Sequence, residues 1–246
     1  MASQQWQLHL FSLVFVAGFV VWDVIYMRRL RRNATETARL NLYRSIVIVL
    51  WATALVACLL TRNTFFRLSP NPFAAQLRFE QLSSGFVLGF GMALLVGLLL
   101  PILLVRCSAN FANIIRKQLK SIAFILPATA QQRRWWVLVS LTAGVCEEVL
   151  YRGYLTYYGT QVLGLGPWAA ALAAAGAFSL AHTYQGWKGV LQTFLLGMVF
   201  MGFYWLTGSL LLSMAMHFVI DVRIILMIPK GGISNEGEGL ATASLA

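Results

Sequence analysis

Several ionisable residues lie where such residues are rare, inside long apolar stretches of the chain. The sequence has 246 residues and only eight Asp and Glu. An ionisable group inside a membrane helix costs about 2.5–3.5 kcal/mol on insertion scales, so such groups usually face the interior of a bundle and mark function. The residues placed in this way are Asp23, Glu147, Glu148, Arg152, His182, His217 and Asp221.

Six polar and aromatic residues form three pairs at a spacing of four. They are Glu148 and Arg152, Phe178 and His182, and His217 and Asp221. Residues four apart share a helix face, so each pair can act together. Glu147 is rotated by about 100° from Glu148, so one carboxylate can bind Arg152 while the other points elsewhere. Any one pair could be a structural ion pair or a packed histidine, but the co-occurrence of all three favours a site. Asp23 stands outside this pattern and is interpreted as an acid at the end of the first helix.

The composition indicates that a lipid bilayer surrounds these residues. The chain is 59% hydrophobic and 11% charged, and its mean hydropathy is +0.72. A soluble domain carries about 25% charged residues. We therefore predict an all-α, polytopic transmembrane bundle with seven or eight membrane helices. Seven apolar runs cover residues 8–27, 43–61, 83–105, 135–158, 168–183, 188–207 and 209–228, and residues 122–126 could add a re-entrant or interfacial element.

The distribution of basic residues predicts the topology. Residues 28–44 hold six arginines, residues 62–80 hold three, and residues 106–134 hold six basic residues. This alternation places the N-terminus outside and, with seven spans, the C-terminus in the cytoplasm. The net charge of +11 thus reflects membrane topology, and we expect no nucleic-acid partner. The first run lacks preceding basic residues and is followed by arginines, so it is predicted to be a retained span. The short chain, the Arg-rich loops and the lack of an organelle signal favour a bacterial inner membrane.

Three further stretches carry structural predictions. Residues 106–126 alternate apolar and basic positions at helical spacing, which suits either an amphipathic surface helix or a simple connector. Gly85 and Gly89 form a GxxxG pattern, which favours close helix packing. The alanine-rich run 169–177 predicts a thin helix deep in the bundle, and the polar tail 229–246 is expected to be disordered.

A family resemblance rests on the three pairs together. Residues 147–153 (EEVLYRG), 178–182 (FSLAH) and 217–221 (HFVID) resemble the motifs of the CPBP family, the CAAX proteases and bacteriocin-processing enzymes also called Abi. Residues 197–213 resemble its Gly-rich helix and Thr-Gly-Ser turn. The resemblance covers about residues 135–228, which we predict to be the catalytic core. Residues 1–134 are predicted to be N-terminal membrane helices with basic cytoplasmic loops.

The resemblance implies an intramembrane glutamate endopeptidase. Glu147 would be the general base, His182 would hold and polarise the water, and Arg152 would orient Glu148. Phe178 would contact the substrate. His217 and the residue four positions later would bind the oxyanion, but family members with prenylated substrates often carry Asn at that later position. Because an ionised carboxylate cannot donate a hydrogen bond, we expect Asp221 to orient His217 instead.

The implied reaction needs no cofactor and no metal, although further functions stay open. His182, His217, Asp221 and Glu147 could bind zinc, which would make the protein a zinc-dependent membrane protease. A non-catalytic bacteriocin immunity protein and a membrane transport or binding protein would also place ionisable residues inside spans. The expected partner is a membrane-associated protein or peptide, with a prenylated protein and a tagged surface protein as the two candidate substrate classes.

Overall fold

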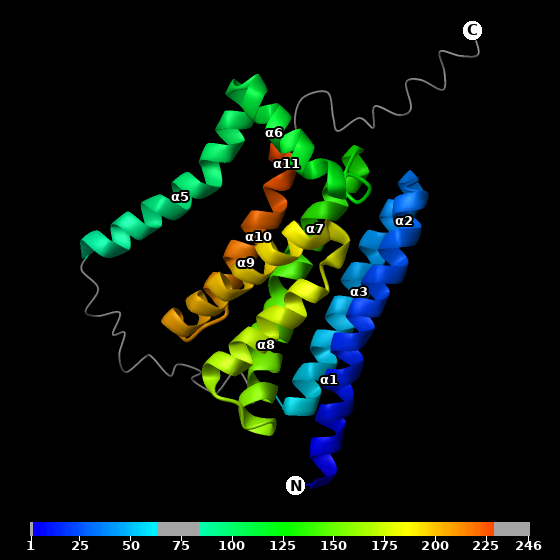
Figure 1. Ribbon diagram of the computed structural model, residues 1–246, viewed down its shortest axis with the longest axis vertical. Helices are drawn as coiled ribbons and strands as arrows, with labels where there is room; N and C mark the ends of the chain where they lie inside the picture. The colour runs from blue at the N-terminus through cyan, green and yellow to red at the C-terminus, as the bar shows by residue number, and fades with distance from the viewer. Residues whose placement is uncertain (1, 63–83, 229–246) are drawn as a thin grey trace.

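The computed structural model describes residues 2–62 and 84–228, and these are helices and turns without a β-strand. The chain begins with a long rod in which α1 (Ala2–Trp22) runs into a π-helical turn, η1 (Asp23–Met27), and then into α2 (Arg28–Arg32). The next helix, α3 (Glu36–Thr61), runs back beside this rod (Figure 1). Thr35 starts α3, since its side chain accepts a hydrogen bond from the backbone N–H of Ala38. Such a cap satisfies a donor that the first helical turn leaves unpaired.

A bent pair of helices follows α3 in the described part of the chain. Helix α5 (Ser84–Cys107) and helix α6 (Ala109–Leu119) meet at 113°, and a short 3₁₀ turn, η3 (Lys120–Ile122), continues from α6. The bend falls at Ser108, whose side chain caps α6 through the N–H of Phe111. The predicted helix over residues 106–126 is therefore present in part, as α6 and η3.

The GxxxG pattern predicts close helix packing, but no such packing is found at these glycines among the described residues. Gly85 and Gly89 are both exposed, and a Cβ built on Gly89 would meet nothing within 4 Å. In Figure 1, α5 diverges from the remaining helices. Arg106 and Arg223 tie its later turns to the end of the bundle, through the carbonyls of Leu226 and Gly97. The glycines lie on the earlier, unattached turns.

The core of the bundle consists of short helices from the second half of the chain. Helix α7 (Ala130–Glu147) begins at a capping box between Thr129 and Gln132. It passes into a π-helix, η4 (Glu148–Leu155), and then η5 (Tyr158–Val162), so the run predicted over 135–158 is not one regular α-helix. The remaining elements are α8 (Pro167–Leu180), the 3₁₀ turn η6 (Thr183–Gln185), α9 (Gly186–Thr207), α10 (Leu211–Val222) and α11 (Ile224–Met227).

Two small-residue features pack these core helices closely. A Cβ on Gly144 of α7 would lie 2.9 Å from the carbonyl oxygen of Met214 and 3.0 Å from the nitrogen of Phe218. The backbones of α7 and α10 can therefore touch only because residue 144 has no side chain. The thin helix predicted from the alanine run is confirmed, since Ala170, Ala171, Ala174 and Ala175 of α8 are buried.

Several helices are long and apolar enough to cross a membrane, which identifies a multi-pass membrane protein. Within the described ranges these are Gln5–Arg32, Glu36–Thr61 and Thr183–Thr207, and the bent pair Met92–Cys107 with Ala109–Ile122 makes a fourth if it is one span. The seven or eight spans predicted from hydropathy are thus only partly found. Helix α8 has 14 residues and α10 has 12, and both are shorter than the 20 or so that span a bilayer alone.

Two predictions fall outside the described residues. The arginine-containing loop 62–80 lies almost wholly in the gap before α5, and the polar tail 229–246 follows the last described residue. The division into an N-terminal region, a core over 135–228 and a tail remains a prediction.

Candidate active site

A cavity of about 340 Å³ opens among α3, α7, α9 and α10. It lies where three predicted site helices meet. Its lining includes Glu147, Phe178, His182, His217 and Asp221. Glu148 and Arg152 are not among its lining residues. The structure thus gathers the predicted residues but divides them between the cavity surface and the protein behind it.

Behind the cavity, Glu148 binds two partners at once. Its Oε1 accepts a hydrogen bond from Nη1 of Arg152 at 3.0 Å and one from Nδ1 of His217 at 2.8 Å. The side chains of Glu148 and Arg152 are 0% and 1% exposed. A buried carboxylate is tolerated when it is both paired and hydrogen-bonded, and Glu148 meets both conditions. The predicted pairing of Glu148 with Arg152 is confirmed, and the bond to His217 adds a link to α10.

The arginine of this pair sits between aromatic rings. The guanidinium carbon of Arg152 lies 4.4 Å from the ring centroid of Phe178 and 5.3 Å from that of Phe200. These are distances at which a cation and an aromatic face attract each other. A Cβ on Gly197 of α9 would come within 3.1 Å of Nη2 of Arg152. The glycine therefore makes room for the buried guanidinium.

On the cavity side, His217 faces two carboxylates at longer range. Its Nε2 lies 3.7 Å from Oε2 of Glu147 and 3.6 Å from Oδ2 of Asp221. These side chains are 14% and 32% exposed, so both are more accessible than Glu148. The role of Asp221 in orienting His217 stays a prediction, and its contact lies on the Nε2 side of the ring. The short hydrogen bond of this ring is the one that Nδ1 donates to Glu148, because η4 brings that carboxylate close to Nδ1.

Helix α8 ends at Leu180, before the end of the apolar run predicted over 168–183, so His182 lies in the turn that follows the helix. Its Nδ1 is 2.8 Å from the carbonyl oxygen of Phe178. A carbonyl can only accept, so Nδ1 carries the hydrogen in this bond. This leaves Nε2 of a neutral His182 with a free lone pair. Phe178 packs against this ring at a centroid distance of 4.7 Å and is only 1% exposed, so it supports the ring of His182 from the protein interior.

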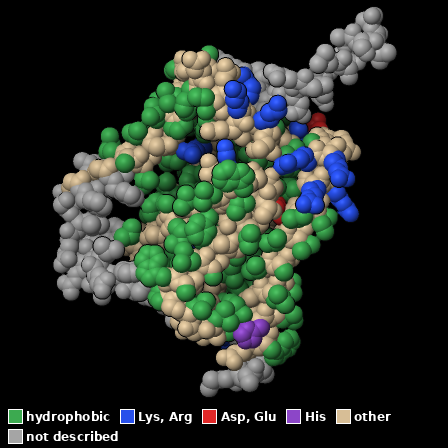
Figure 2. All heavy atoms as spheres, in the orientation of Figure 1, with side chains coloured by type: hydrophobic (Ala, Val, Ile, Leu, Met, Phe, Trp, Pro, Cys, Tyr) green, Lys and Arg blue, Asp and Glu red, His purple; other side chains and the backbone are tan. Residues whose placement is uncertain are grey.

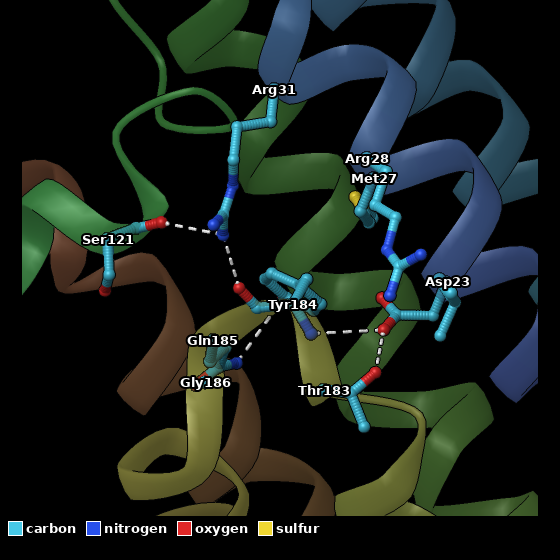
Figure 3. A pocket seen from close by; sticks show the side chains of 10 residues that line it. Asp23, Met27, Arg28, Arg31, Ser121, Thr183, Tyr184, Gln185 and Gly186 are labelled. Carbon is cyan, nitrogen blue, oxygen red and sulfur yellow. Dashed lines mark hydrogen bonds between the residues drawn. The ribbon is translucent and has the colours of Figure 1, made fainter.

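Asp23 directly follows the last residue of α1, as predicted, and it also contacts a turn far along the chain. It is 2% exposed, and its Oδ2 accepts hydrogen bonds from Oγ1 of Thr183 at 2.7 Å and from the backbone N–H of Tyr184 at 3.2 Å. Arg31 donates to the carbonyl of Tyr184, as Figure 3 shows. The first rod therefore holds the turn that follows His182. The available signal was the placement of an acid inside a span.

No group of three or more His, Cys, Asp or Glu side chains among residues 2–62 and 84–228 is arranged to hold a metal ion. Cys146 is buried beside Glu147, and Cys58 and Cys107 are also free thiols. The cavity therefore offers carboxylate and imidazole groups as its reactive side chains.

Comparison with known families identifies the core. Residues 129–223 match the family described as type II CAAX prenyl endopeptidase Rce1-like. The chain thus carries an Rce1-like CAAX endopeptidase domain of the CPBP family, a family of membrane proteases, and the predicted resemblance is confirmed. The matched segment contains all the site residues predicted on the three helices. No curated protein and no solved structure matches the chain.

Proposed function

We propose that this protein is an intramembrane endopeptidase that hydrolyses a peptide bond of a membrane-associated protein or peptide with water activated by Glu147. One observation carries the proposal. Within an Rce1-like domain, Glu147 lines a cavity of about 340 Å³, while the adjacent Glu148 is buried behind it and binds Arg152 and His217 through Oε1. A general base must reach the water, and Glu147 meets this requirement.

In the first step, a water molecule in the cavity gives a proton to the carboxylate of Glu147. Its oxygen attacks the carbonyl carbon of the scissile peptide, and the carbonyl π bond becomes an oxyanion. Nε2 of neutral His182 has the free lone pair needed to hold a second hydrogen of this water, because its Nδ1 is committed to Phe178. Nε2 of His217, which lies between the two cavity carboxylates, donates to the oxyanion when this histidine is protonated.

In the second step, Glu147 returns the proton to the leaving nitrogen. The carbon–nitrogen bond breaks, the oxyanion re-forms a carbonyl, and the products are a carboxylic acid and an amine. The net change is the addition of one water. Glu148 supports both steps as a positioning residue because its bond to Nδ1 fixes the ring of His217. Asp221 contributes charge near Nε2 and has no hydrogen bond to it within normal distance.

The membrane arrangement is part of the proposal. The helices α7, α8 and α10, which carry the site residues, would lie in the bilayer as the interior of the bundle, behind longer apolar helices such as α1 and α3. Seven spans with the N-terminus outside agree with the charge distribution, and Arg28–Arg32 would then lie on the cytoplasmic side. A bacterial inner membrane is the proposed location.

A comparison of three strains tests the proposal. We expect a membrane-associated protein to accumulate uncleaved both in a strain that lacks the gene and in one that carries Glu147→Gln. Quantitative proteomics of membrane fractions, with attention to shifted peptide termini, would detect it. Cleavage restored to the unchanged level in the Glu147→Gln strain, with equal amounts of protein present, would refute the proposed base.

A further inference from the structure

A second cavity of about 320 Å³ lies between the first rod, the η3 turn and the turn after His182 (Figure 3). Its lining includes Asp23, Arg28, Arg31, Ser121, Thr183 and Tyr184. Asp23, Arg28, Arg31 and Ser121 lie outside the matched residues 129–223, whereas Thr183 and Tyr184 lie within them. The cavity borders the active site, since Tyr184 lines both.

One acceptor in this cavity is not used by the protein. Oδ2 of Asp23 makes two hydrogen bonds, but its Oδ1 is buried and has no hydrogen-bond partner within the described ranges. Leaving a buried charged oxygen unpaired costs about 1–3 kcal/mol or more. A ligand that brings an N–H donor would remove this cost.

The cavity also presents a free cation. Arg31 already has protein partners. It donates hydrogen bonds to the carbonyls of Ser121 and Tyr184, and its guanidinium lies 4.8 Å from the ring centroid of Phe124. Arg28 makes no hydrogen bond or ion pair with any residue that the structure describes, and its side chain is exposed. The cavity therefore offers one acceptor for an N–H group and one guanidinium for an anion.

The position of the cavity favours a lipid. Four of the five residues of α2 are arginines, and such a segment cannot lie in hydrocarbon, so the cavity is at the level where the first span leaves the bilayer. Figure 2 shows Lys and Arg side chains gathered at this end of the molecule, over α2 and the region of α6. Basic pockets at this level bind phospholipid headgroups.

We infer that this cavity binds the headgroup of an amine-bearing phospholipid such as phosphatidylethanolamine. The ammonium group donates to Oδ1 of Asp23, and the phosphate accepts from the guanidinium of Arg28. Phosphatidylcholine has the same net charge but no N–H, so it can satisfy Arg28 and not Asp23. Because Asp23 also holds Thr183 and Tyr184, a bound headgroup steadies the turn beside His182. Headgroup binding itself does not depend on the proposed hydrolysis.

Lipid binding to the purified full-length protein tests this directly. Native mass spectrometry in detergent, with matched acyl chains, would compare phosphatidylethanolamine, phosphatidylcholine and phosphatidylglycerol. We expect phosphatidylethanolamine to bind about tenfold more tightly than phosphatidylcholine, as one added charged hydrogen bond implies. Equal affinity of the two would overturn the inference. Strongest binding of phosphatidylglycerol would also overturn it, because that result reports general attraction of anions.

Three variants locate the binding. Asp23→Asn keeps an oxygen for Thr183 and Tyr184 but can place an NH₂ group where the ammonium binds, so it should abolish the preference over phosphatidylcholine. Arg28→Gln should weaken binding of all three lipids about tenfold, while Arg29→Gln, one position away and outside the lining, should leave it unchanged.

An unchanged preference in Asp23→Asn would show that Asp23 does not contact the headgroup. Equal losses of lipid affinity in Arg28→Gln and Arg29→Gln would show that the lipid is attracted by the general positive charge of the surface and not by the cavity. Displacement of the lipid by a peptide with a free C-terminal carboxylate, and not by its amide, would assign the cavity to the substrate. Each of these results contradicts the inference, and unfolding curves of every variant in detergent would separate lost binding from lost folding.

Discussion

The two sides of His217 differ in how deeply their charged groups are buried and in how closely these groups contact the ring. On the Nδ1 side, Glu148 and Arg152 are almost fully buried and linked by contacts of 2.8 and 3.0 Å. On the Nε2 side, Glu147 and Asp221 are partly exposed and stand 3.7 and 3.6 Å away. Two adjacent glutamates therefore have different environments, and a single imidazole separates them.

This difference suggests how one site can be both stable and reactive. The paired side fixes the ring and anchors η4 to α10, so removing a group there should mainly affect folding. The groups on the open side line the cavity that would hold water and a peptide, so removing a group there should mainly affect cleavage. Variants on the two sides can break or sharpen this contrast.

The largest effect on stability is expected at Arg152. Arg152→Met removes the buried guanidinium and leaves Glu148 with His217 as its remaining partner among the described residues. We expect a loss of about 3–5 kcal/mol in the free energy of unfolding, because one charge of a buried pair is left uncompensated. Unfolding in detergent would measure it against Arg29→Met, an exposed control that should change stability by less than about 0.5 kcal/mol. Equal stability of the two variants would mean that the buried pair does not hold the core.

A smaller effect is expected where α7 meets α10. Gly144→Ala would place a Cβ 2.9 Å from the Met214 carbonyl, so the helices must separate and His217 must move with α10. We expect a loss of about 1–3 kcal/mol together with reduced cleavage. Gly176→Ala in α8 is the matched control, since its Cβ would meet nothing within 4 Å, and alanine there should be neutral or slightly stabilising. If Gly144→Ala behaved like this control, the close approach of α7 and α10 would not be needed.

The smallest effect is expected at Asp221. Asp221→Asn removes a charge near Nε2 of His217 but breaks no short hydrogen bond of that ring, which Glu148 already fixes. We expect cleavage to fall less than about tenfold, a change of about 1.4 kcal/mol or less in the barrier. A loss of a hundredfold or more would instead support the orienting role that the sequence suggested for Asp221.

The sequence predicts the identity of the site better than its details. The spacing of four within each pair and the cost of buried charge were sufficient to select Glu147, Glu148, Arg152, His182 and His217. The same reasoning predicted that the two glutamates point in different directions. Their side chains do separate, one to the cavity and one to the pair behind it.

Other features depend on tertiary packing that local patterns do not encode. A π-helix begins at Glu148, but the apolar periodicity of the run gives no sign of it. Asp23 contacts residues 160 and 161 positions later in the chain, so its role follows from how the first rod packs. Hydropathy predicts seven or eight spans, but among residues 2–62 and 84–228 only three or four helices are long enough to cross a membrane alone, because α8 and α10 are apolar without being long.

The most direct test of the account is to compare Glu147→Gln with Glu148→Gln in the same purified system, measuring cleavage per folded molecule and the free energy of unfolding for both. Glu147→Gln should lower cleavage by about 10²–10⁴ and leave stability within about 0.5 kcal/mol of the unchanged protein. Glu148→Gln should lower stability by about 3 kcal/mol or more, since Arg152 loses its counter-charge. Full cleavage by Glu147→Gln, or a Glu148→Gln protein as stable as the unchanged one, would contradict the division between a reactive and a structural glutamate.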